Sequence, residues 1–243
     1  MTEPEARATP GGLVIVHEDP YLVAVVKPAG LLTQANASHE PTLEEAVRRY
    51  LSPEAPSSIY LGTVHRLDRP VSGLVVWART AKAARRLSGQ FERRTTEKTY
   101  WAIVEPHAAA GPPGAEDLWD DWLAGSSDAS GVVAVLGPDQ PGARRAVTRL
   151  RWFPVPPPFT VPEGLRAVEL NPQTGRTHQL RSQAAHRGWP IWGDRAYGST
   201  RPFAAGAIAL HARALRFVHP GSLETMTLVA PLPEIWASSH ESA

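Results

Sequence analysis

The stretch VHRLDRPVSG, residues 64–73, contains a carboxylate in a setting where chemistry is possible. Asp68 lies between Arg66 and Arg69, and a Ser-Gly pair follows shortly after Pro70. One interpretation is an ordinary polar turn with a surface ion pair, which would contribute little to stability. The other is a carboxylate that nearby cations keep ionised, so that it can act on an anionic partner.

A second segment, TGRTHQLRSQAAHRG, concentrates basic side chains behind a glycine. The segment is a helix candidate, on which His178 and Arg181 would share a face because they are three residues apart. Arg176 precedes them directly after the glycine. Donors at a helix N-terminus suit anions, so the segment is compatible with an anionic ligand. A basic face that is simply solvated is the alternative that spacing alone leaves open.

Other catalytic motifs do not fit the sequence. HRLD is similar to a kinase catalytic loop, but the chain has no Gly-rich phosphate loop. Ser72 lacks the preceding glycine of a nucleophile elbow. The chain has no cysteine, and its nine histidines show no H-E-x-x-H spacing. We therefore expect no metal site.

The composition indicates the class of protein but not its activity. A chain of 243 residues with 42% hydrophobic and 20% charged residues predicts a folded protein of one large or two small domains. The net charge of +1 does not by itself indicate nucleic-acid binding. The N-terminus has no signal pattern and no apolar run is long enough to span a bilayer, so we expect a cytoplasmic protein.

Short strands with a few helices between them must position these residues. Helices are expected over 42–51, 81–94 and 176–188, with Thr42 and Thr80 as N-caps of the first two. Strands are expected in two runs within 12–32, and over 72–80, 98–105, 131–136, 146–153, 165–170, 208–210 and 215–220. This order favours a mixed α+β fold over a doubly wound parallel sheet.

Taken together, these segments resemble the signature segments of the RluA-type RNA pseudouridine synthases. The resemblance is carried, in the family's order, by VVKPAGLLTQ, VHRLDRPVSGLVVWART, EKTYWAIV, NPQTGRTHQLRSQAAHRGWPIWGDRAYG and LHARALRFVHP. It implies the pseudouridine synthase fold, an α+β domain with a mixed, mostly antiparallel central sheet, flanking helices and loops. We expect this catalytic domain to span residues 13–236, between flexible tails at 1–12 and 237–243.

The resemblance implies an enzyme that isomerises uridine in structured rRNA or tRNA to pseudouridine without a cofactor. Asp68 would be the essential carboxylate, which attacks either the ribose C1′ or the uracil ring. It must be ionised to act as a nucleophile, and Arg181 would pair with it to keep it so. Tyr100 would stack on the target uracil. The family also implies a monomer, with RNA as its partner and no metal or membrane.

Further residues are expected to contact the RNA. The target base is inaccessible in a stacked helix, so it must be flipped out, and Arg66 would fill the gap that it leaves. His65 would mainly support the loop that carries Arg66. Lys27, Arg176 and His178 are candidates for phosphate or loop contacts, with a solvated or structural role as the alternative for each. Gly73 and Gly175 are expected to serve backbone geometry.

The acidic cluster from Glu116 to Asp121 lies in the turn-rich region 106–145. Its carboxylates would repel a phosphate backbone. We therefore expect it to lie away from any RNA-binding face.

Two departures from the family pattern leave an alternative open. Val71 stands where the family usually has threonine, whose hydroxyl would help to fix the Asp68 loop. The twelve-residue N-terminal tail also has no room for the S4 RNA-binding domain of many members. The alternative is a non-catalytic RNA-binding protein on the same fold. The intact set of Asp68, Tyr100 and Arg181 favours the enzyme.

Overall fold

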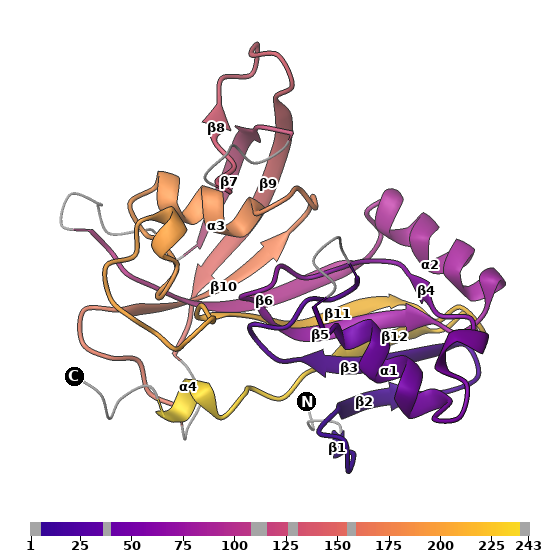
Figure 1. The fold of residues 1–243 in the computed structure, drawn as a ribbon. Coiled ribbons are helices and arrows are strands. Elements are labelled where there is room, and N and C mark those ends of the chain that lie inside the picture. Colours follow the sequence, from indigo (N-terminus) through magenta and orange to yellow (C-terminus); the bar gives the residue numbers. More distant parts are fainter. Residues whose placement is uncertain (1–5, 36–39, 108–115, 126–130, 155–158, 239–243) are drawn as a thin grey trace. The chain divides into compact units, whose positions relative to one another are not determined.

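The computed structural model describes residues 6–35, 40–107, 116–125, 131–154 and 159–238 (Figure 1). The chain forms two compact units. The first unit comprises Met1–Glu97 and Ala212–Leu232, and the second unit comprises Lys98–His211 and Pro233–Ala243. Strands with a few helices make up both units, so the predicted α+β class is confirmed. No helix in the described ranges is both long and apolar enough to cross a membrane.

The first unit is built on a sheet with strand order β1-β2-β3-β5-β11, in which β4 pairs with β5 and β12 with β11. The pairs β1–β2, β2–β3, β3–β5, β4–β5 and β11–β12 are antiparallel. Its strands are β1 (Arg7–Ala8), β2 (Val14–Glu18), β3 (Leu22–Lys27), β4 (Gly62–Thr63), β5 (Ser72–Ala78), β11 (Leu210–Val218) and β12 (Thr225–Val229). The apolar runs predicted β2, β3 and β5. Two separate strands were expected over 208–210 and 215–220, where the structure has the single strand β11. Strand β1 lies within the predicted N-terminal tail, and β12 was not predicted.

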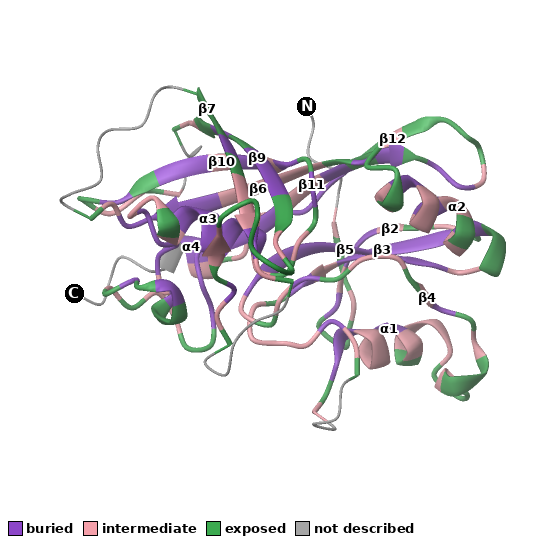
Figure 2. Cartoon of the chain, turned by 90° about the horizontal axis from the view of Figure 1, so that it is seen from above, coloured by how far each residue is buried: buried purple, intermediate pink, exposed green. Residues whose placement is uncertain are grey.

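Two helices of the first unit begin where their threonines predicted. Helix α1 (Leu43–Leu51) starts after Thr42, whose side chain accepts a hydrogen bond from the Glu45 N–H. Helix α2 (Ala81–Glu92) starts after Thr80 in the same way, and η1 (Pro56–Ser58) is a short 3-10 turn. α2 covers one face of the sheet, and its inner residues join a core of Val16, Leu22, Ala24, Leu74, Val76, Ala78, Ala83, Leu87, Leu215, Phe217, Leu228 and Ala230 (Figure 2).

The second unit has an antiparallel sheet with strand order β6-β10-β9-β7-β8. Its strands are β6 (Glu97–Val104), β7 (Glu116–Leu123), β8 (Val135–Leu136), β9 (Arg144–Trp152) and β10 (Arg166–Pro172). Its helices are α3 (Gln179–His186), the 3-10 turn η2 (Arg195–Tyr197) and α4 (Ile235–Ser238). The end of α4 lies within the predicted C-terminal tail, whose residues 239–243 are outside the described ranges.

The acidic cluster from Glu116 to Asp121 forms strand β7, where turn formers had suggested loops. The strand pairs along its length with β9, which is rich in arginine. Asp120 bonds to Arg145 at 2.6 Å, and this cation lowers the pKa of the Asp120 carboxyl. The arginines of the neighbouring strand therefore offset the repulsion that a row of carboxylates would otherwise produce in a strand.

Candidate functional site

Asp68 lies in the loop that joins β4 to β5, and it is half-buried. Its neighbour Leu67 is buried, and Thr33 forms hydrogen bonds with both backbone polar groups of Leu67. The Thr33 hydroxyl donates to the Leu67 carbonyl at 2.8 Å and accepts from the Leu67 N–H at 3.2 Å. The N–H of buried Val71 donates to the Asp68 carbonyl at 3.1 Å and closes a turn. The backbone on both sides of the carboxylate is thus fixed.

Lys27 anchors the same loop from inside the protein. Its Nζ donates to the carbonyls of Pro28 at 3.0 Å, Leu31 at 2.7 Å and Arg69 at 3.0 Å. An ammonium group has three N–H donors, which match these three acceptors. Burial lowers the pKa of Lys27 to about 7, although the charge of Asp68 raises it.

The prediction that Lys27 contacts RNA phosphates is wrong. The residue is 0% exposed and its three donors are satisfied by the protein's own carbonyl groups. No local pattern in the sequence indicates this, because an isolated lysine between two apolar runs is expected to be an exposed charge.

The chain enters β5 through a position that only glycine can occupy. Gly73 has φ +121°, and a Cβ there would lie 2.4 Å from the backbone N and O of Ala212 in β11. The absent side chain lets the two strands approach at the end of the Asp68 loop. This agrees with the prediction that Gly73 serves backbone geometry.

The side chains beside Asp68 differ in their surroundings. Arg66 is exposed, as its proposed contact with RNA requires. His65 is occupied within the first unit, since its Nε2 accepts the Val76 N–H at 2.9 Å and its ring stacks on Phe91 at 4.9 Å. Support of the loop, the main role predicted for His65, fits these contacts. Arg69 pairs with Glu40 at 2.7 Å.

The second unit places Arg181 in a buried ion pair. Arg181 is 7% exposed, and its Nε and Nη2 donate to the two carboxylate oxygens of Asp194 at 2.7 and 2.9 Å. Its guanidinium also lies 4.7 Å from the ring centre of Tyr197. The bonds to Asp194 use two of the five guanidinium N–H groups. The predicted pairing of Arg181 with Asp68 stays a prediction.

The predicted basic face shared by His178 and Arg181 is absent from the structure. His178 is the N-cap of α3 and has φ 50°, so it is not part of the regular helix. Arg181 points into the protein because Asp194 neutralises it there. Asp194 and Tyr197 were not singled out from the sequence, although both lie in the WGDRAYG portion of the longest signature segment.

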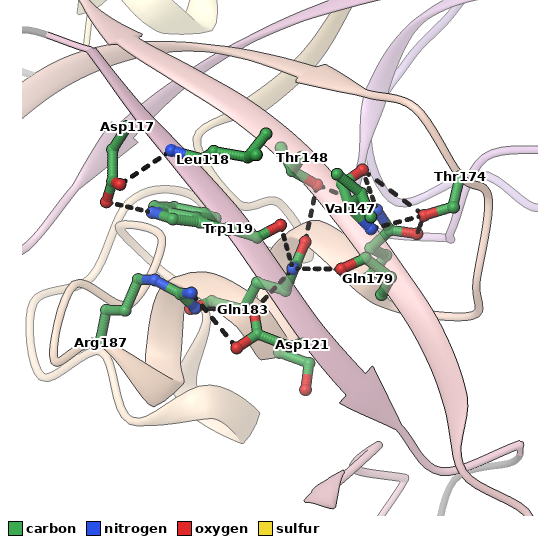
Figure 3. Close-up of polar contacts among 12 residues, drawn as sticks. Asp117, Leu118, Trp119, Asp121, Val147, Thr148, Thr174, Gln179, Gln183 and Arg187 are labelled. Carbon is green, nitrogen blue, oxygen red and sulfur yellow. Dashed lines mark hydrogen bonds and ion pairs between the residues drawn. The ribbon is translucent and has the colours of Figure 1, made fainter. Parts of the chain in front are cut away.

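Two glutamines dock α3 against the sheet of the second unit (Figure 3). The side-chain amide of Gln179 donates to the Val147 carbonyl at 3.1 Å and to the Thr148 hydroxyl at 2.9 Å. Its oxygen accepts from the Thr174 hydroxyl at 2.7 Å and from the Arg176 N–H at 3.0 Å. Gln179 therefore ties the turn before α3 to β9.

Gln183 extends this network one helical turn further along α3. Its oxygen accepts from the Thr148 hydroxyl at 2.6 Å, and its amide donates to Asp121 at 2.7 Å and the Ala146 carbonyl at 3.1 Å. Arg187 bonds to the same carboxylate at 2.8 Å (Figure 3). The helix that carries Arg181 is consequently docked on the sheet by the side-chain amides of two glutamines. Besides the Arg181–Asp194 pair, the ion pair of Arg187 with Asp121 holds its C-terminal end.

Tyr100 lies on β6, half-buried and opposite Leu170 of β10. Lys98, two residues earlier, donates to the Thr174 carbonyl at 2.8 Å and so links β6 to the turn before α3. The Arg176 side chain donates from Nε to the Arg145 carbonyl at 3.1 Å. β6 and this turn therefore hold Tyr100 and Arg176 on elements that are tied together within the second unit.

One group among the described residues has ligand-like spacing for a metal ion: His17, Asp19 and His219. The Nδ1 of His219 accepts the N–H groups of Gly221 and Ser222, so its proton lies on Nε2 and is donated to Asp19 at 2.8 Å. Burial raises the pKa of the Asp19 carboxyl, but its hydrogen bonds outweigh this and the pKa is lowered. A hydrogen-bonded cluster with Asp19 at its centre accounts for the group.

Comparisons with known proteins agree with the sequence resemblance. The family model described as RNA pseudouridylate synthase matches residues 21–186. The tRNA pseudouridine synthase C of Vibrio cholerae is 32% identical over 249 residues, which cover 92% of this chain and 93% of the relative. The protein of the same name from Salmonella typhimurium is 33% identical over 242 residues, covering 92% and 87%.

Two solved structures have the same fold. Human RNA Pseudouridylate Synthase Domain Containing 1 matches with a TM-score of 0.71 and 24% identity, covering 94% of this chain and 86% of that one. Human RNA Pseudouridylate Synthase Domain Containing 4 matches with a TM-score of 0.70 and 24% identity, covering 93% and 90%. The pseudouridine synthase fold predicted from the signature segments is therefore confirmed.

Proposed function

This chain belongs to the RNA pseudouridylate synthase family, and we propose that it isomerises a uridine of tRNA to pseudouridine with Asp68 as the essential carboxylate. As a member of this family it is an enzyme, an isomerase that acts on RNA. The comparisons thus favour the enzyme over the alternative of a non-catalytic RNA-binding protein. The tRNA substrate is supported by the names of relatives that match 92% of the chain.

The observation that carries the role of Asp68 is the way its loop is held. Thr33 and Lys27 fix the backbone before and after it, while the residue itself remains half-buried. A loop that served only as a surface turn would not need a buried ammonium beneath it. A fixed carboxylate at partial exposure is what a nucleophile needs, because it must meet its substrate in one geometry.

The proposed reaction is an isomerisation in which atoms balance without a cofactor. The bond between C1′ and N1 breaks, the uracil turns, and C1′ becomes bonded to C5. The hydrogen on C5 leaves as a proton, and N1 gains a proton. Asp68 acts by attack on C1′ or on the uracil ring, and both routes need the ionised carboxylate.

Arg181 and Tyr100 are proposed as the other catalytic residues. Arg181 would favour the ionised form of Asp68, because a nearby cation stabilises a carboxylate. The ion pair with Asp194 would keep the guanidinium in a fixed orientation for this purpose. Tyr100 would stack on the uracil, and its half-buried position on β6 is compatible with that role.

Arg66, Arg176 and His178 are proposed to contact the RNA. Arg66 is exposed beside Asp68, where a planar guanidinium could take the place of the flipped base. Arg176 and His178 lie in the turn before α3, which the network around Gln179 fixes. We also propose a cytoplasmic monomer, since tRNA is found there and the reaction requires one carboxylate and one active site.

The proposal is tested by incubating the purified protein with tRNA from a strain that lacks its gene, followed by chemical mapping of pseudouridine. We expect conversion of specific tRNA uridines. Asp68→Asn should give no conversion, whereas Asp139→Asn, a matched change at an exposed carboxylate, should retain it.

The same assay has outcomes that would overturn the proposal. Conversion of rRNA without tRNA would contradict the substrate class. Release of free uracil would indicate hydrolysis of the glycosidic bond. RNA binding without any conversion would restore the non-catalytic alternative.

A further inference from the structure

The outer face of α2 is strongly basic. Lys82, Arg86 and Arg93 follow one another at helical spacing, and Arg85 lies beside them. Arg94 continues the series directly after the C-cap. We call these five residues the α2 basic face. Arg86 is half-buried and the other four are exposed.

Within the described part of the chain, no ion pair neutralises this face. The side chains of Lys82, Arg85 and Arg94 have no hydrogen bond or ion pair there. The Arg86 guanidinium donates to the Pro220 carbonyl at 2.5 Å, a bond that leaves its charge in place. The positive charge of α2 is therefore available to a partner outside the chain.

The positions of the charged residues in α2 lower the stability of the helix. Lys82 lies in the first turn, which contains no acid, although the helix dipole favours acids there. Lys82 and Arg86 are four residues apart and repel each other. Helix α1 of the same unit has the opposite arrangement, with Glu44 in its first turn bonded to Arg48 at 2.9 Å.

Gly89 within α2 and Arg94 just after its C-cap are residues that lower the stability of the helix and of its C-terminal end. Gly89 lies inside the helix, where alanine would be more stable. A Cβ at this position would lie 2.8 Å from Nη1 of Arg93, so the glycine gives the guanidinium room to lie against the helix. Arg94 has φ 58° at the position after the C-cap, where glycine is the usual residue.

The location of α2 connects this face with the reactive loop. Phe91 of α2 stacks on His65, which is three residues from Asp68 within the same unit. The helix is about 18 Å long by its rise per residue, enough to follow several phosphates of a nucleic-acid strand. The His65–Phe91 contact thus joins the C-terminal part of α2 to the start of the Asp68 loop.

We propose that the α2 basic face binds the phosphate backbone of the substrate RNA beside the target uridine. The inference rests on the proposed function, because it takes the same RNA as the ligand. Arginine suits phosphate through paired N–H donors, and four of the five residues are arginines. Contacts to phosphates position the RNA without reading its sequence.

The test removes charge from α2 and measures RNA binding and turnover separately. The variant Lys82→Gln/Arg85→Gln/Arg93→Gln/Arg94→Gln is compared with wild type for Kd, KM and kcat on tRNA across salt concentrations. We expect Kd and KM to rise about tenfold or more. The salt slope of log Kd should fall by about 0.7 to 0.9 for each phosphate that the variant no longer neutralises. The kcat at saturating tRNA should change less than about twofold.

Two measurements separate a binding role from a structural one. The single variants Arg85→Gln on α2 and Arg49→Gln on α1 remove the same charge from exposed positions. Only Arg85→Gln should weaken tRNA binding. Arg94→Gly should raise the Tm by several degrees and still weaken binding, because glycine fits the left-handed conformation without strain.

Unchanged Kd and salt slope in the fourfold variant would overturn the inference, and wild-type turnover would show that the proposed function stands. Weakened binding accompanied by a lower Tm in every variant would also overturn it, because loss of folding would then explain the effect. If wild type itself converts no RNA, the proposed function fails first.

Discussion

The loop that carries Asp68 and the helix that carries Arg181 are held by different kinds of polar group. Beneath the loop, the ammonium of Lys27 serves three backbone carbonyls and is 0% exposed. Beneath α3, Gln179 and Gln183 make the corresponding contacts with neutral amides (Figure 3). Both anchors satisfy buried backbone groups, which would otherwise be costly to desolvate.

The difference between the anchors lies in their response to pH. Burial lowers the pKa of Lys27 to about 7, so the anchor of the Asp68 loop can lose a proton near neutrality. Amides and hydroxyls do not titrate in this range. Substitutions and changes of pH should therefore affect the anchor of the Asp68 loop and the anchor of α3 differently.

Replacement of the carboxylate should have the largest effect. We expect Asp68→Asn to lower single-turnover pseudouridine formation by roughly a thousandfold or more, because asparagine is no nucleophile. The loop should keep its conformation, since Thr33 and Lys27 hold backbone atoms and not the carboxylate. Unchanged Tm and tRNA affinity would confirm that the loss is chemical. Full activity of the variant would show that Asp68 is not the reactive group.

The next effect should come from the ion pair in the second unit. Arg181→Lys keeps the charge but loses the two-pronged contact with Asp194, so the cation should be misplaced. We expect kcat to fall roughly a hundredfold, the scale of a small misplacement of a catalytic group. The matched variant Arg151→Lys, in a surface pair with Glu169, should keep its activity. Equal activity of both variants would remove Arg181 from the mechanism.

Lys27 should make stability depend on pH. Its pKa is about 7 in the folded protein and 10.5 in an unperturbed lysine. Between these values the unfolded chain binds a proton that the folded chain does not, so the free energy of unfolding should rise with pH by up to about 1.4 kcal/mol per unit. Below about pH 7 the full destabilisation by the buried charge is present. Urea unfolding of wild type and Lys27→Met across this range measures the difference, which should change only above about pH 7.

Deprotonation of Lys27 should also affect the rate of the reaction. A neutral amine has two N–H donors for three carbonyls, so loss of the proton should loosen the loop and lower kcat above about pH 7. Lys27→Met should lack this inflection. Gln179→Met, the matched change in the neutral anchor, should be less active at every pH but keep the inflection. If Lys27→Met also kept the inflection in kcat, Lys27 would not be its cause, and the proposed difference in pH response between the two anchors would be wrong.

Features of the structure that depend on residues close together in the sequence could be predicted from the sequence. Thr42 and Thr80 mark the starts of α1 and α2 because a cap bonds only to the next turn. The signature segments also marked Asp68 and the turn before α3. A resemblance to a family compares residue types and their order along the chain, and these two properties were enough to single out both segments.

The contacts that were not predicted join residues far apart in the chain. Lys27 reaches Arg69 across 42 positions, and burial of a lysine is not visible in the sequence around it. Asp194 was overlooked because its partner Arg181 lies in another element. The acidic strand β7 is stabilised by arginines of β9, which only the sheet register brings opposite to it.

The smallest effect should follow from Val71, the residue that departs from the family pattern. Its side chain is 3% exposed, and its N–H already bonds to the Asp68 carbonyl. Val71→Thr would add a buried hydroxyl to a turn that is already closed, and we expect kcat within about threefold of wild type. The Tm should fall slightly unless the hydroxyl finds a partner. A large gain in kcat would show that valine loosens the loop.

Release of hydrogen from C5 tests the central claim most directly. The purified protein is incubated with tRNA that carries tritium at C5 of uridine, and the tritium in water is compared with the pseudouridine formed. The proposed isomerisation predicts equal amounts of both and no free uracil, because C5 must lose its hydrogen when it bonds to C1′. Bound tRNA that releases no tritium, or releases uracil instead, would contradict it.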